Sequence, residues 1–238
     1  MINNSRHPID LETLTRYLTS QKPDIFEAPL TLKQFGFGQS NPSYQIIDAK
    51  DRKYVLRKQP PGTLVSKSAH RVDREYHMIK AISSTGKVPV PEVYLLCQDK
   101  SIIGSDFYIM NFVSGRIFHD PRIPSLSAKD RNECWASAIT TLANLHSLDP
   151  SKIGLPNSFT KNLSSHYPRQ VVTLNKVHEA QAQVTDSKTG KVLGPIPNFD
   201  TLIEFIKTHT PPERVGIVHG DYKIDNLVSI SRIVLVIF

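Results

Sequence analysis

The chain has 238 residues, 39% of them hydrophobic, which is enough for one large domain or two small lobes with a buried core and excludes a disordered chain. Its 29 basic and 22 acidic residues give a formal net charge of +7, but the basic residues are spread along the sequence without a run. This diffuse charge argues against a nucleic-acid-binding protein and suits an anionic small ligand such as a nucleotide.

The two cysteines, Cys97 and Cys134, lie far apart without the spacing of a metal site, so a disulfide framework is not expected and a reducing compartment is. The N-terminus lacks the apolar core of a signal peptide, and no stretch of about 20 apolar residues could span a bilayer. The sequence therefore predicts a soluble, intracellular protein, cytoplasmic by default, with no membrane partner. Mitochondrial and peroxisomal placements stay open, and no oligomeric state is predicted.

The first half of the chain alternates strand-like and helical patterns. A short helix is predicted after Asp10, whose side chain can cap it. Strand-like runs follow at residues 30–35, 43–47, 53–58, 88–97 and 106–113. Between the third and fourth runs, apolar residues recur at helical spacing, namely Val72, Tyr76, Ile79 and Ile82. This order predicts an antiparallel sheet with one helix packed on it.

The second half of the chain is predicted to be mainly helical. Ser127, with Asp130 three residues later, resembles a capping box at the start of a helix. The apolar stripe of that helix is predicted to comprise Trp135, Ile139, Leu142 and Leu145. Residues 149–200 are polar and broken by prolines, so the next predicted element is a short helix at 199–206.

The strongest local signal is His219-x-Asp221-x-x-x-x-Asn226, which follows a brief apolar run. Phosphoryl transfer needs a carboxylate beside the attacking hydroxyl and a ligand that holds Mg²⁺ on the phosphates. Kinase-like folds place the two on one tight loop, with the same spacing as between Asp221 and Asn226. Asp221 would accept the hydroxyl proton, Asn226 would bind the metal, and Lys223 could lie against the transferred phosphate. The alternative is a polar turn whose side chains satisfy backbone groups.

Gly36 and Gly38 lie between two predicted strands, where glycine lets backbone approach a phosphate. An ordinary hairpin turn is the alternative, and Asn41 replaces the third glycine of the protein-kinase pattern. The third strand should then carry a cation for the α- and β-phosphates. Strand alternation sends Arg57 and Lys58 to opposite faces. Val55 and Arg57 share a face, so Arg57 is the residue that fits the position of the lysine in the Val-Ala-Ile-Lys pattern of kinases. A surface cation is the alternative for either residue.

Glu75 lies on the helix that follows this strand, where a carboxylate could pair with the cation. A solvated surface charge is the alternative for Glu75. The last strand of the predicted sheet runs into a connector at Gly115. Backbone N–H and C=O groups of Asn111, Phe112 and Val113 could bind the edge of an adenine, although an ordinary strand end would have the same sequence.

Several long segments resemble the aminoglycoside phosphotransferase/choline-kinase-like family. The resemblance is to the kinase-like domain found alone, or fused to acyl-CoA dehydrogenase, in the group called acyl-CoA dehydrogenase family members 10 and 11. The segments that carry it are Phe37–Tyr44, Tyr54–Gly62, Ser68–Tyr76, Leu142–His146 and His219–Asn226. They are specific in sequence, and together they extend over most of the chain.

The resemblance implies an α+β, protein-kinase-like bilobal fold that uses ATP and Mg²⁺. Residues 1–29 would form an N-terminal helical segment, residues 30–113 the nucleotide-binding lobe, and residues 114–238 a partial C-lobe with the catalytic loop at 219–226. The partners would be a nucleotide and a small-molecule hydroxyl acceptor, in this group a hydroxylated acyl compound. Gly220, where protein kinases usually carry arginine, argues against a protein substrate.

The residues expected to serve this chemistry fall into three sets. The catalytic set is Asp221 and Lys223, and the metal ligand is Asn226. The nucleotide-binding set is Gly36, Gly38, Ser40, Asn41, Arg57, Glu75, Asn111, Phe112 and Val113.

The chain departs from the family pattern after the loop. Family members place a second metal-binding aspartate beyond the loop asparagine, whereas residues 227–238 contain no Asp or Glu. The sequence therefore predicts a C-terminally truncated, inactive copy of such a phosphotransferase. The alternative is a non-catalytic nucleotide-binding pseudokinase or scaffold, so the sequence leaves open whether the chain is an enzyme.

Overall fold

The structure is a computed structural model that describes residues 9–36, 41–60, 71–160, 166–212, 214–230 and 234–237. The chain divides into two compact units. The first comprises Met1–Leu148, Lys152–Leu155 and Ile217–Phe238, and the second comprises Asp149–Ser151 and Pro156–Gly216. The boundaries predicted from the sequence, at residues 29 and 113, separate an N-terminal segment and two kinase lobes rather than these two units, and they stay predictions.

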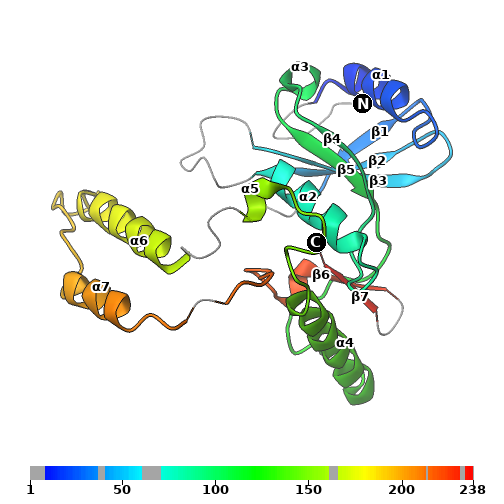
Figure 1. Ribbon diagram of the computed structural model, residues 1–238. Coiled ribbons are helices and arrows are strands. Elements are labelled where there is room, and N and C mark those ends of the chain that lie inside the picture. The colour runs from blue at the N-terminus through cyan, green and yellow to red at the C-terminus, as the bar shows by residue number, and fades with distance from the viewer. Residues whose placement is uncertain are drawn as a thin grey trace. The chain divides into compact units, whose positions relative to one another are not determined.

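The first unit is built on a five-stranded antiparallel sheet, as predicted (Figure 1). Its strands are β1 (Thr31–Gln34), β2 (Ser43–Ile47), β3 (Lys53–Lys58), β4 (Val93–Cys97) and β5 (Phe107–Asn111), in the spatial order β1-β2-β3-β5-β4. The fourth strand begins later than the predicted residue 88, because Pro89 and Pro91 cannot donate to a ladder. The prediction also missed the short helix α3 (Lys100–Ile103), which Asp99 caps.

A helix packs on each face of this sheet (Figure 1). On one face lies α1 (Leu11–Gln21), capped by Asp10 as predicted, whose Leu14 and Leu18 share a core with Leu56. On the other face lies α2 (Val72–Ser83), whose Val72 packs with Val55 of β3. Because successive strand residues face opposite ways, this arrangement decides where each side chain of β3 points.

The two adjacent cations of β3 accordingly have different environments. Lys58 lies on the α1 side and is only 4% exposed, with its Nζ 3.5 Å from the carbonyl oxygen of Ile103. Burial lowers the pKa of the Lys58 amine. Arg57 lies on the α2 side, where it pairs with a carboxylate described below. The face predicted for Arg57 is therefore confirmed.

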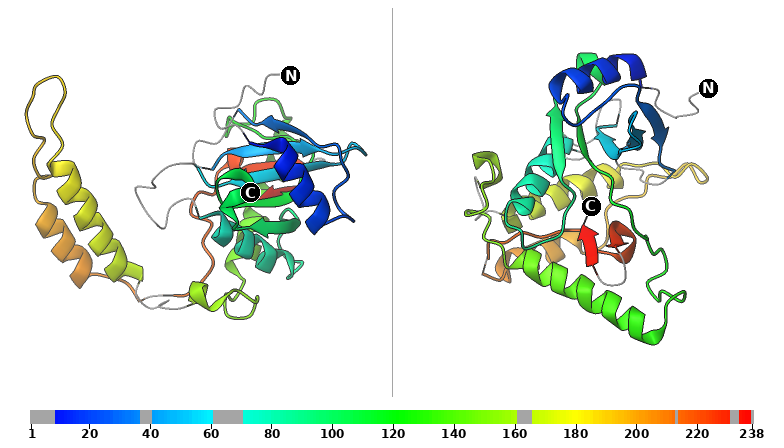
Figure 2. Two further views of the ribbon diagram at one scale, coloured as in Figure 1. Left: turned by 90° about the horizontal axis from the view of Figure 1, so that it is seen from above. Right: turned by 90° about the vertical axis from the view of Figure 1, so that its right-hand side faces the viewer.

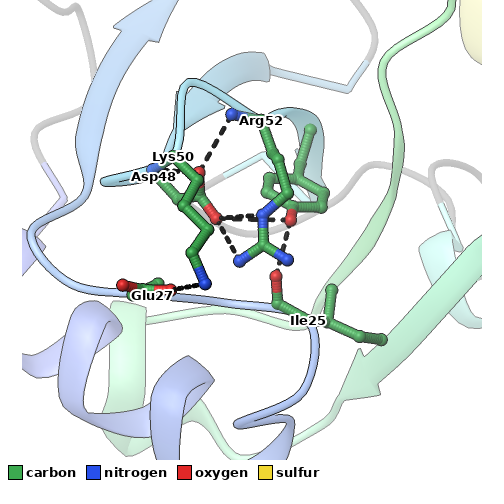
Figure 3. A network of polar contacts seen from close by, with 6 residues as sticks. Ile25, Glu27, Asp48, Lys50 and Arg52 are labelled. Carbon is green, nitrogen blue, oxygen red and sulfur yellow. Dashed lines mark hydrogen bonds and ion pairs between the residues drawn. The ribbon is translucent and has the colours of Figure 1, made fainter.

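A buried carboxylate organises the turn between β2 and β3 (Figure 3). Asp48 is 4% exposed and accepts hydrogen bonds from the backbone N–H groups of Lys50 (3.0 Å) and Arg52 (2.9 Å) and from the Arg52 Nε (2.8 Å). The neighbouring Tyr54 hydroxyl donates to the Ile25 carbonyl at 2.6 Å. This bond ties β3 to the segment that joins α1 to β1.

The helix α4 (Ala128–His146) begins at Ser127, which caps it through the Asp130 N–H as predicted. The predicted apolar stripe was wrong at Ile139, which is 64% exposed. The buried positions of α4 are Cys134, Ala138, Thr141 and Leu145. They recur at spacings of four, three and four, so the buried face includes a small residue and a threonine that a search for large apolar residues passes over.

The α4 helix runs beside a C-terminal hairpin of β6 (Leu227–Ile230) and β7 (Val234–Ile237) (Figure 2, green and red). The connector after β5 reaches this hairpin at Arg116, whose backbone exchanges hydrogen bonds of 2.9 and 2.8 Å with Ser229. Gly115 approaches the hairpin so closely that an added Cβ would collide with the Val228 Cγ1 and the Ser229 carbonyl oxygen. This position therefore requires glycine.

We expect Gly115→Ala to lower the free energy of unfolding by about 1–3 kcal/mol, because the methyl group has no room without moving β6. Gly216→Ala is the matched control, since a Cβ there meets nothing within 4 Å. Urea unfolding of both variants measures the difference. Equal unfolding midpoints for the two variants would show that the close approach at Gly115 is not a constraint.

The second unit contains α5 (Asn157–Thr160), α6 (His166–Ala182) and α7 (Phe199–Thr208). The predicted helix near 199–206 is confirmed as α7, but α6 was missed. Pro168 lies in the first turn of α6, where proline leaves no broken helical hydrogen bond, so it does not interrupt the helix as the sequence suggested. Within the described ranges, none of the helices combines the length and apolar character needed to cross a membrane.

Candidate functional site

Three side chains from different parts of the first unit converge on the carboxylate of Glu75, in the first turn of α2. The Arg57 Nε of β3 lies 2.8 Å from Glu75 Oε2, so the predicted pairing of these two residues is present. The Tyr108 hydroxyl of β5 donates to the same oxygen at 3.2 Å. The Asn41 Nδ2, just before β2, donates to Oε1 at 2.7 Å.

The register of the sheet explains why these side chains meet. Arg57 is the direct cross-strand partner of Tyr108 on β5 and of Ser43 on β2, so Arg57 and Tyr108 stand side by side on the face that α2 covers. The sequence predicted Asn41 in the glycine-containing loop and Tyr108 in the last strand of the sheet, with no role for Tyr108 at the site. The alternation of β5 places Tyr108 on one of its faces, but only the pairing of β5 with β3 shows that its neighbour there is Arg57.

Two members of this cluster, Tyr108 and Asn41, are buried, whereas the side chains of Arg57 and Glu75 are 28% and 32% exposed. Tyr108 is 1% exposed, and burial, together with the nearby Glu75 carboxylate, raises the pKa of its hydroxyl well above the ordinary value. Asn41 is 3% exposed, and its Oδ1 has no hydrogen-bond partner in the described part of the chain. The Arg57 Nε–H does not point along the line to Glu75, so that contact is an ion pair rather than a hydrogen bond.

The loop at 219–226 forms a second polar group. Gly220 has φ +84°, a left-handed conformation that favours glycine, and a single 3₁₀ turn spans Ile224–Asn226. The Asn226 Nδ2 donates to the Asp221 backbone oxygen at 2.8 Å and to its carboxylate Oδ2 at 2.9 Å. Lys223 places its Nζ 3.8 Å from Asp221 Oδ2. The three residues predicted to act together are thus brought together by the fold.

Apolar anchors on either side hold this loop. Ile224 and Leu227 are buried in a core shared with α4, which also includes Ala81 and Ile82 at the end of α2. One packed core therefore supports both the loop and the helix that carries Glu75.

Polar contacts tie the loop down as well. The Tyr222 hydroxyl donates to the Ala138 carbonyl at 2.6 Å, and burial raises the pKa of Tyr222 to about 12. The His219 Nδ1 accepts from the Asp221 N–H at 3.3 Å, so this nitrogen is unprotonated. Burial lowers the pKa of His219, which favours the neutral ring, although the Asp221 carboxylate acts in the opposite direction.

The strand end predicted to bind adenine is partly committed to the sheet. The Asn111 N–H donates to the Glu92 carbonyl at 2.9 Å, and the Phe112 N–H donates to the Lys53 carbonyl at 3.2 Å. In the described residues, Val113 is the one member of this segment whose N–H is not committed in this way. The predicted use of the Asn111 and Phe112 N–H groups therefore needs correction, because these groups complete the ladder of β5.

The remaining predicted residues belong to the glycine-containing segment. Gly38 and Ser40 lie outside the described residues. Gly36 is described, and an added Cβ there would meet nothing within 4 Å, so internal packing does not require glycine at this position. The preceding residue, Phe35, stacks its ring on that of Phe112, with the ring centroids 6.4 Å apart. This contact links the start of the glycine-containing segment to the end of β5.

Comparison with known proteins gives a family for this arrangement. The phosphotransferase enzyme family matches residues 31–230. The chain is 39% identical over 228 residues to acyl-CoA dehydrogenase family member 11 of Rattus norvegicus, and the match covers 94% of this chain and 27% of the relative. It is 39% identical over 221 residues to acyl-CoA dehydrogenase family member 10 of Mus musculus, and that match covers 92% of this chain and 19% of the relative. The chain thus spans about a quarter or less of the length of these relatives.

Solved structures agree. A crystal structure from Ralstonia eutropha, provisionally named an aminoglycoside phosphotransferase, matches with a TM-score of 0.71 and 32% identity, covering 93% of this chain and 61% of that chain. The streptomycin–ATP–APH(2″)-IIa ternary complex matches at 16% identity with a TM-score of 0.56, over all of this chain and 72% of that one, and shows the shared kinase-like fold. The chain therefore belongs to the phosphotransferase enzyme family.

Proposed function

We propose that the chain is the nucleotide-binding and catalytic-loop part of an ATP- and Mg²⁺-dependent phosphotransferase that acts on a small-molecule hydroxyl. The observation that carries the proposal is the ion pair between Arg57 of β3 and Glu75 of α2. In kinases the corresponding cation–carboxylate pair must be in place for the cation to hold the nucleotide phosphates. The family membership and the kinase-like fold support the same reaction class.

The roles proposed for the remaining residues follow from the kinase pattern, and Gly38 and Ser40 lie outside the described residues. Asp221 receives the proton of the acceptor hydroxyl, and Lys223 neutralises charge on the transferred phosphate. The segment with Gly36, Gly38, Ser40 and Asn41 covers the nucleotide. The adenine edge binds at residues 111–113, through the Val113 N–H and the carbonyl groups, because the other two N–H groups are occupied.

The donor set at the loop suits Mg²⁺ on a nucleotide. The described residues contain no cluster of three His, Cys, Asp or Glu side chains that could hold a metal by themselves. Mg²⁺ usually takes one or two protein ligands together with phosphate oxygens and waters. Asn226 commits its Nδ2 to Asp221, which leaves Oδ1 as the amide atom for the metal. When bound, Mg²⁺ would neutralise charge on the phosphates.

The acceptor is proposed from the relatives. The curated relatives carry the name acyl-CoA dehydrogenase, and the ternary complex contains streptomycin and ATP. We propose a hydroxylated acyl compound as the acceptor, because the identity to the acyl-CoA dehydrogenase family members is more than twice that to the streptomycin complex.

A second candidate is a non-catalytic nucleotide-binding protein. The side chain of Asp221 is 70% exposed and already paired with Asn226, and the described residues contain no larger acidic cluster beside it. Nucleotide binding without phosphoryl transfer to any hydroxylated acceptor would favour this candidate. Release of ADP that depends on a hydroxylated acceptor would exclude it.

Calorimetric titration of ATP with and without Mg²⁺ tests the proposed metal site. We expect Mg²⁺ to tighten ATP binding to the wild type, and Asn226→Ala to remove most of this gain, because the variant loses the proposed protein ligand of the metal. Asn175→Ala, a half-buried position on α6 in the other unit, is the control. If Asn226→Ala keeps the full Mg²⁺ effect, the metal is not held at this loop.

A further inference from the structure

We propose that Asn41 and Tyr108 are positioning residues that fix the Glu75 carboxylate, and through it the Arg57 guanidinium, in the orientation that receives the nucleotide phosphates. The inference rests on the proposed function and adds two residues from outside the Arg57–Glu75 pair. It follows from the hydrogen bonds that converge on Glu75, all within the first unit.

Each oxygen of the Glu75 carboxylate is held by a different structural element. Oε1 accepts from Asn41, which precedes β2, at 2.7 Å. Oε2 accepts from Tyr108 of β5 at 3.2 Å and faces Arg57 of β3 at 2.8 Å. A carboxylate bound at one oxygen can rotate about its last torsion, whereas one bound at both cannot without losing a bond. Glu75 is therefore fixed in orientation as well as in position.

The Asn41 amide has one workable orientation. If its oxygen and nitrogen exchanged places, two acceptor oxygens would face each other at the 2.7 Å separation from Glu75 Oε1, which is repulsive. Its Oδ1 is buried and has no hydrogen-bond partner in the described residues, so the bond from Nδ2 to Glu75 is the side-chain hydrogen bond that holds this amide there. Asn41 therefore joins the glycine-containing segment to α2.

Tyr108 can act only as a donor to Glu75. Burial and the Glu75 carboxylate raise the pKa of its hydroxyl far above neutrality, so the proton stays on the oxygen. The ring is 1% exposed and packs against Tyr76 of α2, which fixes the hydroxyl in place. Removing the hydroxyl alone would leave the packing almost unchanged.

These contacts determine what Arg57 offers to a ligand. The carboxylate engages the guanidinium through Nε, which leaves the two terminal nitrogens as a fork for phosphate oxygens. If the Glu75 carboxylate rotates, the Arg57 guanidinium loses the ion-pair partner that orients it. Its two terminal nitrogens are then no longer held toward the phosphates. Loss of one charge-assisted hydrogen bond weakens ATP–Mg²⁺ binding by about tenfold where the effect is fully transmitted.

The test compares two tyrosine hydroxyls on opposite faces of the same sheet. Tyr108→Phe removes the bond to Glu75, and the control Tyr54→Phe removes a bond to the Ile25 carbonyl, on the α1 face. We expect about tenfold weaker ATP–Mg²⁺ binding for Tyr108→Phe and unchanged binding for folded Tyr54→Phe. Equal affinities for Tyr108→Phe and the wild type would overturn the role of Tyr108.

Two substitutions of Asn41 separate positioning from packing. Asn41→Ala loses the donor, whereas Asn41→Asp keeps the shape and places a second carboxylate against Glu75. We expect weaker nucleotide binding for Asn41→Asp than for Asn41→Ala, because like charges repel across 2.7 Å. The reverse order would show that Asn41 acts by filling space.

A nucleotide-free measurement keeps this inference separate from the proposed function. If the wild type binds no ATP, the proposed function fails, and a double-mutant cycle in urea decides whether Tyr108 fixes Glu75. We expect the effects of Tyr108→Phe and Glu75→Gln on the unfolding midpoint to be non-additive, and those of Tyr54→Phe and Glu75→Gln to add. Additive effects in both cycles would overturn the inference.

Discussion

Replacing Asp221 with asparagine is expected to lower phosphoryl transfer by about 10²–10⁴-fold, because the loop loses the group that accepts the hydroxyl proton. The shape of the loop should survive. The Asn226 Nδ2 also donates to the Asp221 backbone oxygen, a bond that the substitution leaves intact. We therefore expect ATP affinity to change little while acceptor-dependent ADP release falls, as measured by a coupled assay with hydroxylated acyl acceptors.

Asp120→Asn provides the control for this experiment. Asp120 is another carboxylate of the same unit, and it pairs with the exposed Arg122 rather than with a residue of the loop. Its substitution is expected to leave transfer unchanged. If Asp221→Asn retains the wild-type rate, Asp221 is not the proton acceptor and the assignment of the loop fails.

The Asp48→Ala substitution is expected to lower the free energy of unfolding by about 2–4 kcal/mol. Asp48 is a buried carboxylate whose hydrogen bonds hold the β2–β3 turn, so its removal leaves the N–H groups of Lys50 and Arg52 without an acceptor (Figure 3). The Arg52 side chain also loses its ion-pair partner at 2.7 Å. The estimate stays below that for a fully buried pair, because Arg52 is partly exposed.

The matched control for Asp48 is the neighbouring surface ion pair. Lys50 and Glu27 lie 2.5 Å apart, but both side chains are about half exposed or more. Lys50→Ala should cost less than about 1 kcal/mol. Thermal unfolding of the two variants gives the comparison, and an equal loss in both would contradict the role assigned to the buried carboxylate.

The Asp48 carboxylate also makes the free energy of unfolding depend on pH. Burial by itself raises the pKa of Asp48, but the hydrogen bonds from Arg52 and Lys50 outweigh it and hold the pKa below the ordinary value of 3.8. A group whose pKa is lowered by folding stabilises the protein above its unfolded pKa, and this contribution is lost as the pH falls through the folded pKa. The stability difference between wild type and Asp48→Asn should therefore narrow below about pH 4.

The sequence was sufficient for features that depend on short-range periodicity. Strand alternation assigned Arg57 and Lys58 to opposite faces, and the position of Glu75 on the following helix correctly predicted the pairing partner of Arg57. The spacing between Asp221 and Asn226 likewise predicted a loop in which the two side chains meet. Caps at Asp10 and Ser127 were recognisable because capping needs only adjacent residues.

Features that depend on strand pairing could not be obtained in this way. Tyr108 reaches Glu75 because β5 lies next to β3 in a fixed register, and no local pattern gives that register. The neighbours of β5 also occupy two N–H groups that had been predicted to bind adenine: the Asn111 N–H donates to Glu92, just before β4, and the Phe112 N–H donates to Lys53 of β3. Ile139 was wrongly predicted to be buried because the prediction selected large apolar residues. The buried face of α4 consists largely of small and polar residues instead.

The most direct test of the nucleotide site is calorimetric titration of ATP–Mg²⁺ into the wild type, Arg57→Ala and Lys58→Ala. The two cations are adjacent in sequence, but only Arg57 lies on the α2 face with Glu75. The wild type and the folded Lys58→Ala variant should bind with similar affinity, and Arg57→Ala should bind at least about tenfold more weakly. Unchanged binding by Arg57→Ala would contradict a phosphate site built on the Arg57–Glu75 pair.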